Sequence, residues 1–166
     1  MADAGILRPD ARVELIEGEI IDMAPIGSRH AAAVERLAAA LRLAVGDRAM
    51  VRTQQPVTLD EHSEPEPDLA VVIAREDYYE RGHPRPSDVL LIVEVADTTH
   101  ACDRDMKVPL YARHGVPEVW IVDLENRRIE RHSAPNGGKF TERCMISSGE
   151  RLGLSALGGV GVDFAL

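Results

Sequence analysis

Short apolar runs separated by polar loops recur along the chain, and they predict the strands of a β-sheet. The runs at 69–73, 89–93 and 119–122 are long enough for buried strands and too short for globular helices. Residues 127–132 alternate between polar and apolar positions, so we expect them to form an antiparallel neighbour of the third run. A final strand pair is expected near residues 140–145.

Two helices are expected beside this sheet. Between residues 29 and 45, apolar side chains recur at steps of three and four and form one face, which is typical of an amphipathic helix. We expect Ser28 to cap its start and Gly46 to end it. A second helix is predicted at 103–114, where Pro109 requires either that the regular helix begins near it or that the first turn is kinked. The combination predicts an α/β fold with a mixed sheet.

The first part of the chain adds a hairpin and an edge strand. Residues 13–23 form two apolar-rich arms around a Glu-Gly turn, which is typical of a β-hairpin. Residues 51–59 are strand-like but contain Pro56, so we expect two pieces of a bent edge strand. Residues 1–11 show no periodicity and are expected to be a loose lead-in. We therefore expect residues 1–166 to form a single domain.

Composition favours a soluble cytoplasmic protein. The 166 residues, of which 45% are hydrophobic and 28% charged, suffice for one buried core. No apolar run approaches the roughly 20 residues of a membrane helix, and the residues after Met1 do not begin a signal peptide. Cys102 and Cys144 lack metal-binding spacing and are expected to be reduced thiols.

Two carboxylates stand at the ends of neighbouring predicted strands. Asp68 precedes the first apolar run, and Glu94 follows the second one 26 positions later. Burying an uncompensated carboxylate is costly, so each must be solvated, paired, hydrogen-bonded or metal-bound. Adjacent strands could let the two share Mg²⁺ or Mn²⁺, with Lys107 orienting or activating a water. In the alternative, both carboxylates cap strands at the surface and Lys107 pairs only with Asp103.

A longer pattern extends these residues into a family motif. It comprises Pro67-Asp68, Glu94-Val95-Ala96, Asp103-Arg104-x-x-Lys107 and Leu110-Tyr111-Ala112-Arg113-x-Gly115-Val116-Pro117-Glu118-x-Trp120-Ile121-Val122-Asp123. With this pattern, residues 13–164 resemble the Uma-two family, described as "putative restriction endonucleases", a branch of the PD-(D/E)XK nuclease superfamily. The resemblance implies a restriction-endonuclease-like mixed β-sheet flanked by helices. Ala96 stands where the superfamily motif places a lysine, and Lys107 is the candidate replacement.

The resemblance also points to three further site candidates. The family pattern places a glutamate at Glu14, a histidine at His30 and a glutamine before proline at Gln55. Glu14 would add a carboxylate to the site, His30 would face it from the first helical turn, and Gln55 would hold a phosphate or the site's water. Without the resemblance, Glu14 is more simply a solvent-facing strand residue, Gln55 is more simply a polar residue beside a strand ladder, and His30 is at least as compatible with a surface position near a helix start.

The net charge of −9 opposes nucleic-acid binding, because surfaces that bind nucleic acid usually gather lysine and arginine. A local basic rim could nevertheless coexist with acidic residues elsewhere. The candidates for such a rim are Arg75, Arg81, Arg85, Arg104 and Arg113. The alternative is that these arginines are solvated surface charges.

These patterns together predict a metal-dependent endonuclease that hydrolyses the phosphodiester bonds of nucleic acid, with DNA as the expected substrate. Asp68, Glu94 and the carbonyl of Val95 would hold Mg²⁺ or Mn²⁺, and Lys107 would act on the water. We expect a homodimer, because duplex cleavage needs two cuts. Two alternatives remain open: a non-catalytic interaction protein on the same fold, and a metal-dependent hydrolase of a small phosphorylated molecule. A basic groove would favour nucleic acid, and a small closed pocket would favour the small substrate.

Overall fold

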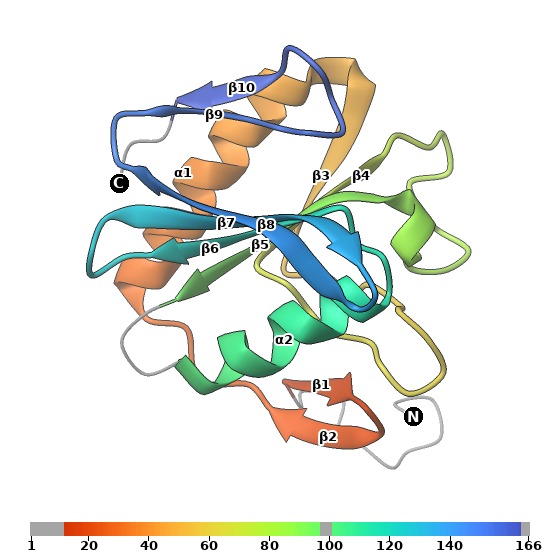
Figure 1. Ribbon diagram of the computed structural model, residues 1–166. Helices are drawn as coiled ribbons and strands as arrows, with labels where there is room; N and C mark the ends of the chain where they lie inside the picture. Colours follow the sequence, from red (N-terminus) through yellow and green to blue (C-terminus); the bar gives the residue numbers. More distant parts are fainter. Residues whose placement is uncertain (1–11, 97–100, 164–166) are drawn as a thin grey trace.

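The computed structural model describes residues 12–96 and 101–163, with side chains given from residue 105 onward in the second range. The strands are β1 (Val13–Ile16), β2 (Glu19–Asp22), β3 (Ala49–Thr53), β4 (Leu69–Ile73), β5 (Val89–Ala96), β6 (Glu118–Asp123), β7 (Arg128–Asn136), β8 (Lys139–Ser147), β9 (Arg151–Gly153) and β10 (Gly161–Asp163), as Figure 1 shows. The helices are α1 (Ser28–Val45) and α2 (Ala101–Arg113), with 3₁₀ turns at Gly46–Arg48 and Pro86–Asp88.

One mixed sheet organises the molecule. Its six strands lie in the order β3-β4-β5-β6-β7-β8, and every neighbouring pair is antiparallel except β5 and β6. These two strands are parallel because the chain crosses over between them through α2. The hairpins β1–β2 and β9–β10 stand outside this sheet. The mixed α/β architecture expected from the sequence is therefore confirmed.

A helix covers each face of the sheet (Figure 1). Leu69 and Val71 of β4 belong to the core under α1, whereas Ala70 and Val72 belong to the core under α2. This division follows from the alternation of side chains along a strand. Because both faces are covered, the central strands are apolar on both faces except near their ends, which explains why they appear as continuous apolar runs in the sequence.

The two helices differ in detail from the sequence prediction. Gly27, and not Ser28, occupies the N-cap of α1, and no side chain caps the helix there; the prediction of a Ser28 cap was wrong. Helix α2 runs from Ala101 to Arg113 as one element with Pro109 inside it, so the helix neither begins at the proline nor divides there. The C-terminal glycine predicted for α1, Gly46, is confirmed, with its N–H bonded to the carbonyl of Arg42.

The bent edge strand was predicted only in part. β3 is the edge strand of the sheet, but it begins at Ala49 and ends at Thr53, and the residues after it form no second strand. The backbone turns at Gln54, whose φ of 47° is incompatible with a strand. Val57 and Leu59 are still buried, and the N–H of Val57 bonds to the carbonyl of Pro65. Burial, and not sheet pairing, explains the apolar residues of this segment.

Several expectations concern residues outside the described ones, namely the lead-in at 1–11 and the side chains of Cys102, Asp103 and Arg104. Cys144 is an exposed free cysteine on β8. Among the described helices, none has both the length and the apolar character that a membrane span requires.

One residue of the family motif has a structural role on the α1 face. Glu118 is 1% exposed, accepts a bond from Trp120 Nε1 at 2.5 Å and accepts one from the N–H of Ser155 at 3.0 Å. The guanidinium of Arg131 lies 3.0 Å from the same carboxylate. Glu118 therefore joins β6 and β7 to the segment between the two C-terminal strands.

Replacing Glu118 should weaken the fold. Glu118→Ala leaves the Trp120 N–H and the Arg131 guanidinium without their shared acceptor, so we expect the free energy of unfolding to fall by about 3 kcal/mol. The matched control is Glu125→Ala, at an exposed turn position, which should change it by less than about 0.5 kcal/mol. Urea denaturation of both variants measures this, and equal losses would contradict the role of Glu118.

Candidate active site

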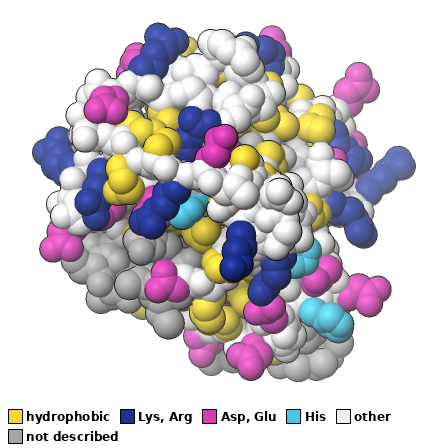
Figure 2. Space-filling model, in the orientation of Figure 1, with side chains coloured by type: hydrophobic (Ala, Val, Ile, Leu, Met, Phe, Trp, Pro, Cys, Tyr) yellow, Lys and Arg dark blue, Asp and Glu magenta, His cyan; other side chains and the backbone are white. Residues whose placement is uncertain are grey.

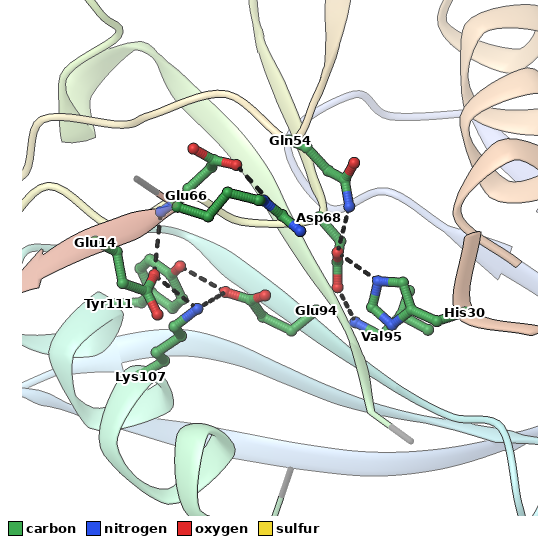
Figure 3. Close-up of polar contacts among 10 residues, drawn as sticks. Glu14, His30, Gln54, Glu66, Asp68, Glu94, Val95, Lys107 and Tyr111 are labelled. Carbon is green, nitrogen blue, oxygen red and sulfur yellow. Dashed lines mark hydrogen bonds and ion pairs between the residues drawn. The ribbon is translucent and has the colours of Figure 1, made fainter. Parts of the chain in front are cut away.

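The candidate site forms where β4 begins and β5 ends. The two strands are antiparallel with Leu69 opposite Val93. One further step in this register places Asp68 opposite Glu94, and residues directly opposite each other point to the same face of the sheet. The family motif thus places two neighbouring carboxylates where β4 begins and β5 ends (Figure 3).

Both carboxylates line a pocket of about 240 Å³. Its walls come from β1, from the linker between β2 and α1, from the start of α1, and from α2. The lining residues are Arg12, Glu14, Asp22, Met23, Ala24, Pro25, Ile26, Gly27, His30, Gln54, Glu66, Asp68, Glu94, Val95, Ala96, Lys107 and Ile121. Segments far apart in the sequence therefore converge on the two strand ends.

Asp68 is held on both of its carboxylate oxygens. Oδ1 lies 2.8 Å from Nε2 of His30 and accepts a longer bond of 3.4 Å from Nε2 of Gln54. Oδ2 accepts the backbone N–H of Val95 at 2.8 Å. The contacts come from α1, from the turn after β3 and from β5, so three elements fix the orientation of one carboxylate (Figure 3).

Glu94 and Lys107 form the second part of the site. Oε1 of Glu94 accepts the hydroxyl of Tyr111 at 2.7 Å and lies 3.6 Å from Nζ of Lys107. The same ammonium lies 2.9 Å from Oε2 of Glu14. Lys107 is only 7% exposed, and a buried ammonium requires such partners. Lys107 and Tyr111 come from successive turns of α2, which explains their four-residue spacing.

The placement of Glu14 depends on an extended segment. The residues Leu15 and Glu64 pair through their backbones, with the N–H of Glu64 bonded to the carbonyl of Leu15 at 2.7 Å. This bridge brings β1 to the Pro-rich segment before β4. Oε2 of Glu14 then accepts the N–H of Glu66 at 3.2 Å, so the hairpin is tied to the strand that carries Asp68.

Burial and neighbouring charges perturb the protonation of this cluster. Burial raises the pKa of Glu94 to about 7; Asp68 and Glu14 add to the rise, while Lys107 and the Tyr111 hydroxyl oppose it. Burial, together with the Glu94 carboxylate, raises the pKa of Tyr111 well above its ordinary value, so this hydroxyl stays protonated as a donor. Burial also raises the pKa of Glu66, against the opposing charge of Arg12.

The donor set suits a hard divalent cation. Within the described residues, no three His, Cys, Asp or Glu side chains converge to hold a metal by themselves. Mg²⁺ needs fewer protein ligands than this, because it is usually bound by one or two carboxylates and keeps several waters. Among the described residues, both contacts of the Glu94 carboxylate involve Oε1, so Oε2 could bind an ion beside Asp68 and the Val95 carbonyl. Burial is the main cause of the raised pKa of Glu94, and a bound cation would favour the ionised carboxylate that burial disfavours.

The structure brings together most of the residues singled out in the sequence. Six of them line the pocket: Glu14, His30, Asp68, Glu94, Val95 and Lys107. Gln55 does not, because it is exposed, and its neighbour Gln54 contacts Asp68 instead. The pairing of β3 with β4 explains the choice, because Thr53 lies opposite Leu69 and one further step places Gln54 opposite Asp68. The N–H of Gln54 also bonds to the carbonyl of Asp68 at 3.0 Å.

Three other residues that line the pocket or contact its carboxylates were not chosen as site candidates from the sequence. Tyr111 lies four positions after Lys107, so helical spacing alone could have indicated it. Glu66 lies two positions before Asp68 in an extended stretch, which places both on one side of the chain. Arg12 lies 4.0 Å from Glu66, and its sequence context carries no signal for that contact.

Four of the five arginines considered for a basic rim lie away from the pocket, and the side chain of Arg104 lies outside the described part of the chain. Arg75, Arg81 and Arg85 belong to the loop at the opposite ends of β4 and β5, and Arg75 pairs with Asp77 there. Arg113 pairs with Glu17 of the hairpin turn. None of these four lines the pocket, whereas Arg12 does. All four are exposed, which agrees with the alternative of surface charges.

Comparison with known proteins connects this geometry to a family. A model of the family described as "Uma2: Putative restriction endonuclease" matches residues 3–165. The chain belongs to the Uma2 family. A crystal structure of a "putative nuclease belonging to DUF820" from Anabaena variabilis shares the fold, with a TM-score of 0.71 and 16% identity over 93% of this chain and 87% of that one. The comparison with curated proteins finds no match.

Membership of the Uma2 family agrees with the resemblance found in the sequence motif. The structural similarity also confirms the nuclease-like α/β fold that the resemblance implied. Within this fold, Glu94, Lys107 and Tyr111 act as one buried group, because each contacts another of the three. Lysine on α2 takes the place beside the carboxylates that Ala96 of β5 cannot fill.

The raised pKa of Glu94 predicts how stability depends on pH. Between the ordinary value of 4.5 and about 7, the folded protein holds the Glu94 proton more tightly than the unfolded chain. Stability should therefore fall as pH rises through this range, by up to about 3 kcal/mol, and Glu94→Gln should remove that loss. Urea denaturation from pH 4.5 to 8 in chelator measures both curves. The exposed control Glu61→Gln should parallel the wild type, and a parallel curve for Glu94→Gln would contradict the assignment.

Proposed function

We propose that this Uma2-family chain is a metal-dependent endonuclease that hydrolyses phosphodiester bonds of nucleic acid, with DNA as its substrate. The observation that carries the proposal is the convergence of Asp68, Glu94 and Lys107 in one pocket. Paired carboxylates with an ammonium group beside them are suited to phosphoryl chemistry at a hard cation. Membership of a family described as "Putative restriction endonuclease" supports the same reading.

The roles of the residues follow from their contacts. Asp68, Glu94 and the Val95 carbonyl would hold Mg²⁺ or Mn²⁺, and the ion would supply Lewis-acid polarisation of the phosphoryl oxygens. His30 keeps the Asp68 carboxylate in place, and Tyr111 does the same for Glu94. Lys107 would orient the attacking water and stabilise the charge that develops on the phosphate, because its ammonium can donate to both.

A second candidate, a hydrolase of small phosphorylated molecules, has specific support. The pocket is small, and it is lined by five carboxylates against only two obligate cations, Arg12 and Lys107. On the face drawn in Figure 2, lysine and arginine are interspersed with aspartate and glutamate and do not gather into one basic patch. Assaying small phosphomonoesters alongside plasmid and oligonucleotide DNA separates the two functions.

Loss of Asp68 should abolish metal binding and cleavage together. Asp68→Asn removes the charge that attracts the cation but preserves the shape of the side chain, so we expect neither calorimetric Mg²⁺ binding nor nicking of plasmid DNA. Asp47→Asn, at an exposed position in the turn after α1, provides the matched control and should keep both. Metal binding by Asp68→Asn at wild-type strength would contradict the proposed ligand.

Loss of Lys107 should separate binding from chemistry. Lys107→Ala should keep the fold and Mg²⁺ affinity but lower the cleavage rate by about 10²–10³, the usual effect of deleting one preorganised donor. The exposed Lys139→Ala is the matched control and should cleave at the wild-type rate. Full activity of Lys107→Ala would rule out its role, and wild-type protein that cleaves nothing with either metal would favour a non-catalytic interaction protein.

The proposal extends to assembly if duplex DNA is cut on both strands. One domain with one site supplies the two cuts most simply as a two-fold homodimer, whose interface should bury more than about 1,000 Å². Light scattering at micromolar concentration measures the mass. A monomer that still makes both cuts in one encounter would exclude the homodimer.

A further inference from the structure

Part of the pocket wall is apolar. Residues 23–26, in the linker between β2 and α1, contribute Met23, Ala24, Pro25 and Ile26 to the lining. Figure 1 shows this linker passing the sheet edge at which β5 ends. Ile26 remains 40% exposed, although a large apolar side chain is more stable when covered. Metal-assisted phosphoryl chemistry does not need such a surface, so the wall suits another part of the substrate.

The reactive groups are recessed in the pocket. The side chains of Asp68 and Glu94 are each 14% exposed, and that of Lys107 is 9% exposed. The pocket volume of about 240 Å³ lies below the roughly 300–1,000 Å³ of pockets that enclose drug-sized ligands. It leaves room for one small group, such as a phosphate or an unstacked base, and a stacked segment of duplex is too large to enter. A nucleotide outside the stack can present both its phosphate and its base to the pocket.

The charge of the pocket lining acts in the same direction. Asp22, Glu66 and Glu14 line the pocket in addition to the two central carboxylates. With all five carboxylates ionised, one divalent cation together with Arg12 and Lys107 leaves this lining net negative. Duplex DNA brings one charge per about 1.7 Å of its axis, twice the density along one strand. The acidic lining therefore repels two backbones more than one.

We propose that the pocket accepts an unpaired nucleotide, so that the substrate is single-stranded nucleic acid or an unpaired segment of a duplex. The apolar linker holds the unstacked base, as apolar side chains do in enzymes that extrude bases. The amide of Gln54, anchored to Asp68 through Nε2, directs its Oε1 away from that carboxylate, where it can accept a bond from a base (Figure 3). This inference rests on the proposed nuclease function and narrows its substrate.

Matched oligonucleotides test the substrate class. The substrates are one labelled DNA strand, its blunt duplex, and a duplex with a central unpaired segment, each incubated with Mg²⁺ or Mn²⁺. We expect the single strand, and the duplex within its unpaired segment, to be cut at least ten times faster than the blunt duplex. Equal or faster cleavage of the blunt duplex overturns the unpaired-nucleotide assignment and leaves the nuclease function standing.

A charge placed on the apolar wall tests the base-binding role. Ile26→Asp should weaken binding of the single strand at least fivefold, measured by fluorescence anisotropy in Ca²⁺, and should slow its cleavage in Mg²⁺ by a similar factor. Leu43→Asp carries the same change on the outer surface of α1, where Leu43 is 87% exposed, and should match the wild type. Identical behaviour of the two variants overturns the assignment.

The binding measurement decides the inference even without turnover. If no substrate is cut, the proposed nuclease function fails. Binding of the single strand in preference to the duplex, weakened by Ile26→Asp alone, would still support an unpaired-nucleotide site. Equal affinity for both forms, or no binding of either, would overturn it.

Discussion

The antiparallel pairing of β4 with β5 is the constraint on which the site depends. Its register places two carboxylates opposite each other at one edge of the sheet, and like charges in that position destabilise the pair. The remaining contacts compensate for this repulsion. His30, Gln54 and a backbone N–H satisfy Asp68, while Tyr111 and Lys107 satisfy Glu94. A site of this kind is stable only as a complete network.

The groups around Glu94 do not fully offset the cost of burying its charge, and this determines the protonation of the pocket. The pKa of Glu94 stays raised to about 7 despite Lys107 and Tyr111, because burial and the other carboxylates outweigh them. A cation bound between Asp68 and Glu94 would remove the imbalance, so the cost of burying these charges becomes affinity for metal. Burial thus lowers the stability of the free protein, and a bound cation would recover part of that loss.

The structure shows where part of the acidic charge that opposed nucleic-acid binding lies. Five of the carboxylates line the pocket, and the four described arginines expected around it lie at the other end of the strands or pair with the hairpin. A protein that binds duplex DNA in a basic groove would place lysine and arginine side chains around its site. The recessed pocket and its apolar linker suit a single unstacked nucleotide, which reconciles a net charge of −9 with a nuclease family.

The sequence by itself determined both helices and most strands of the sheet, because amphipathic spacing and buried apolar runs are local patterns. Its motif also predicted Asp68, Glu94 and Lys107 as the central candidates. Tertiary structure decided which neighbours surround them. Gln54 replaced Gln55 because the pairing of β3 with β4 places Gln54 opposite Asp68, and Arg12 approached Glu66 through a hairpin docked far along the chain. Such contacts depend on the pairing and packing of separate segments, which leave no periodic trace in the order of the amino acids.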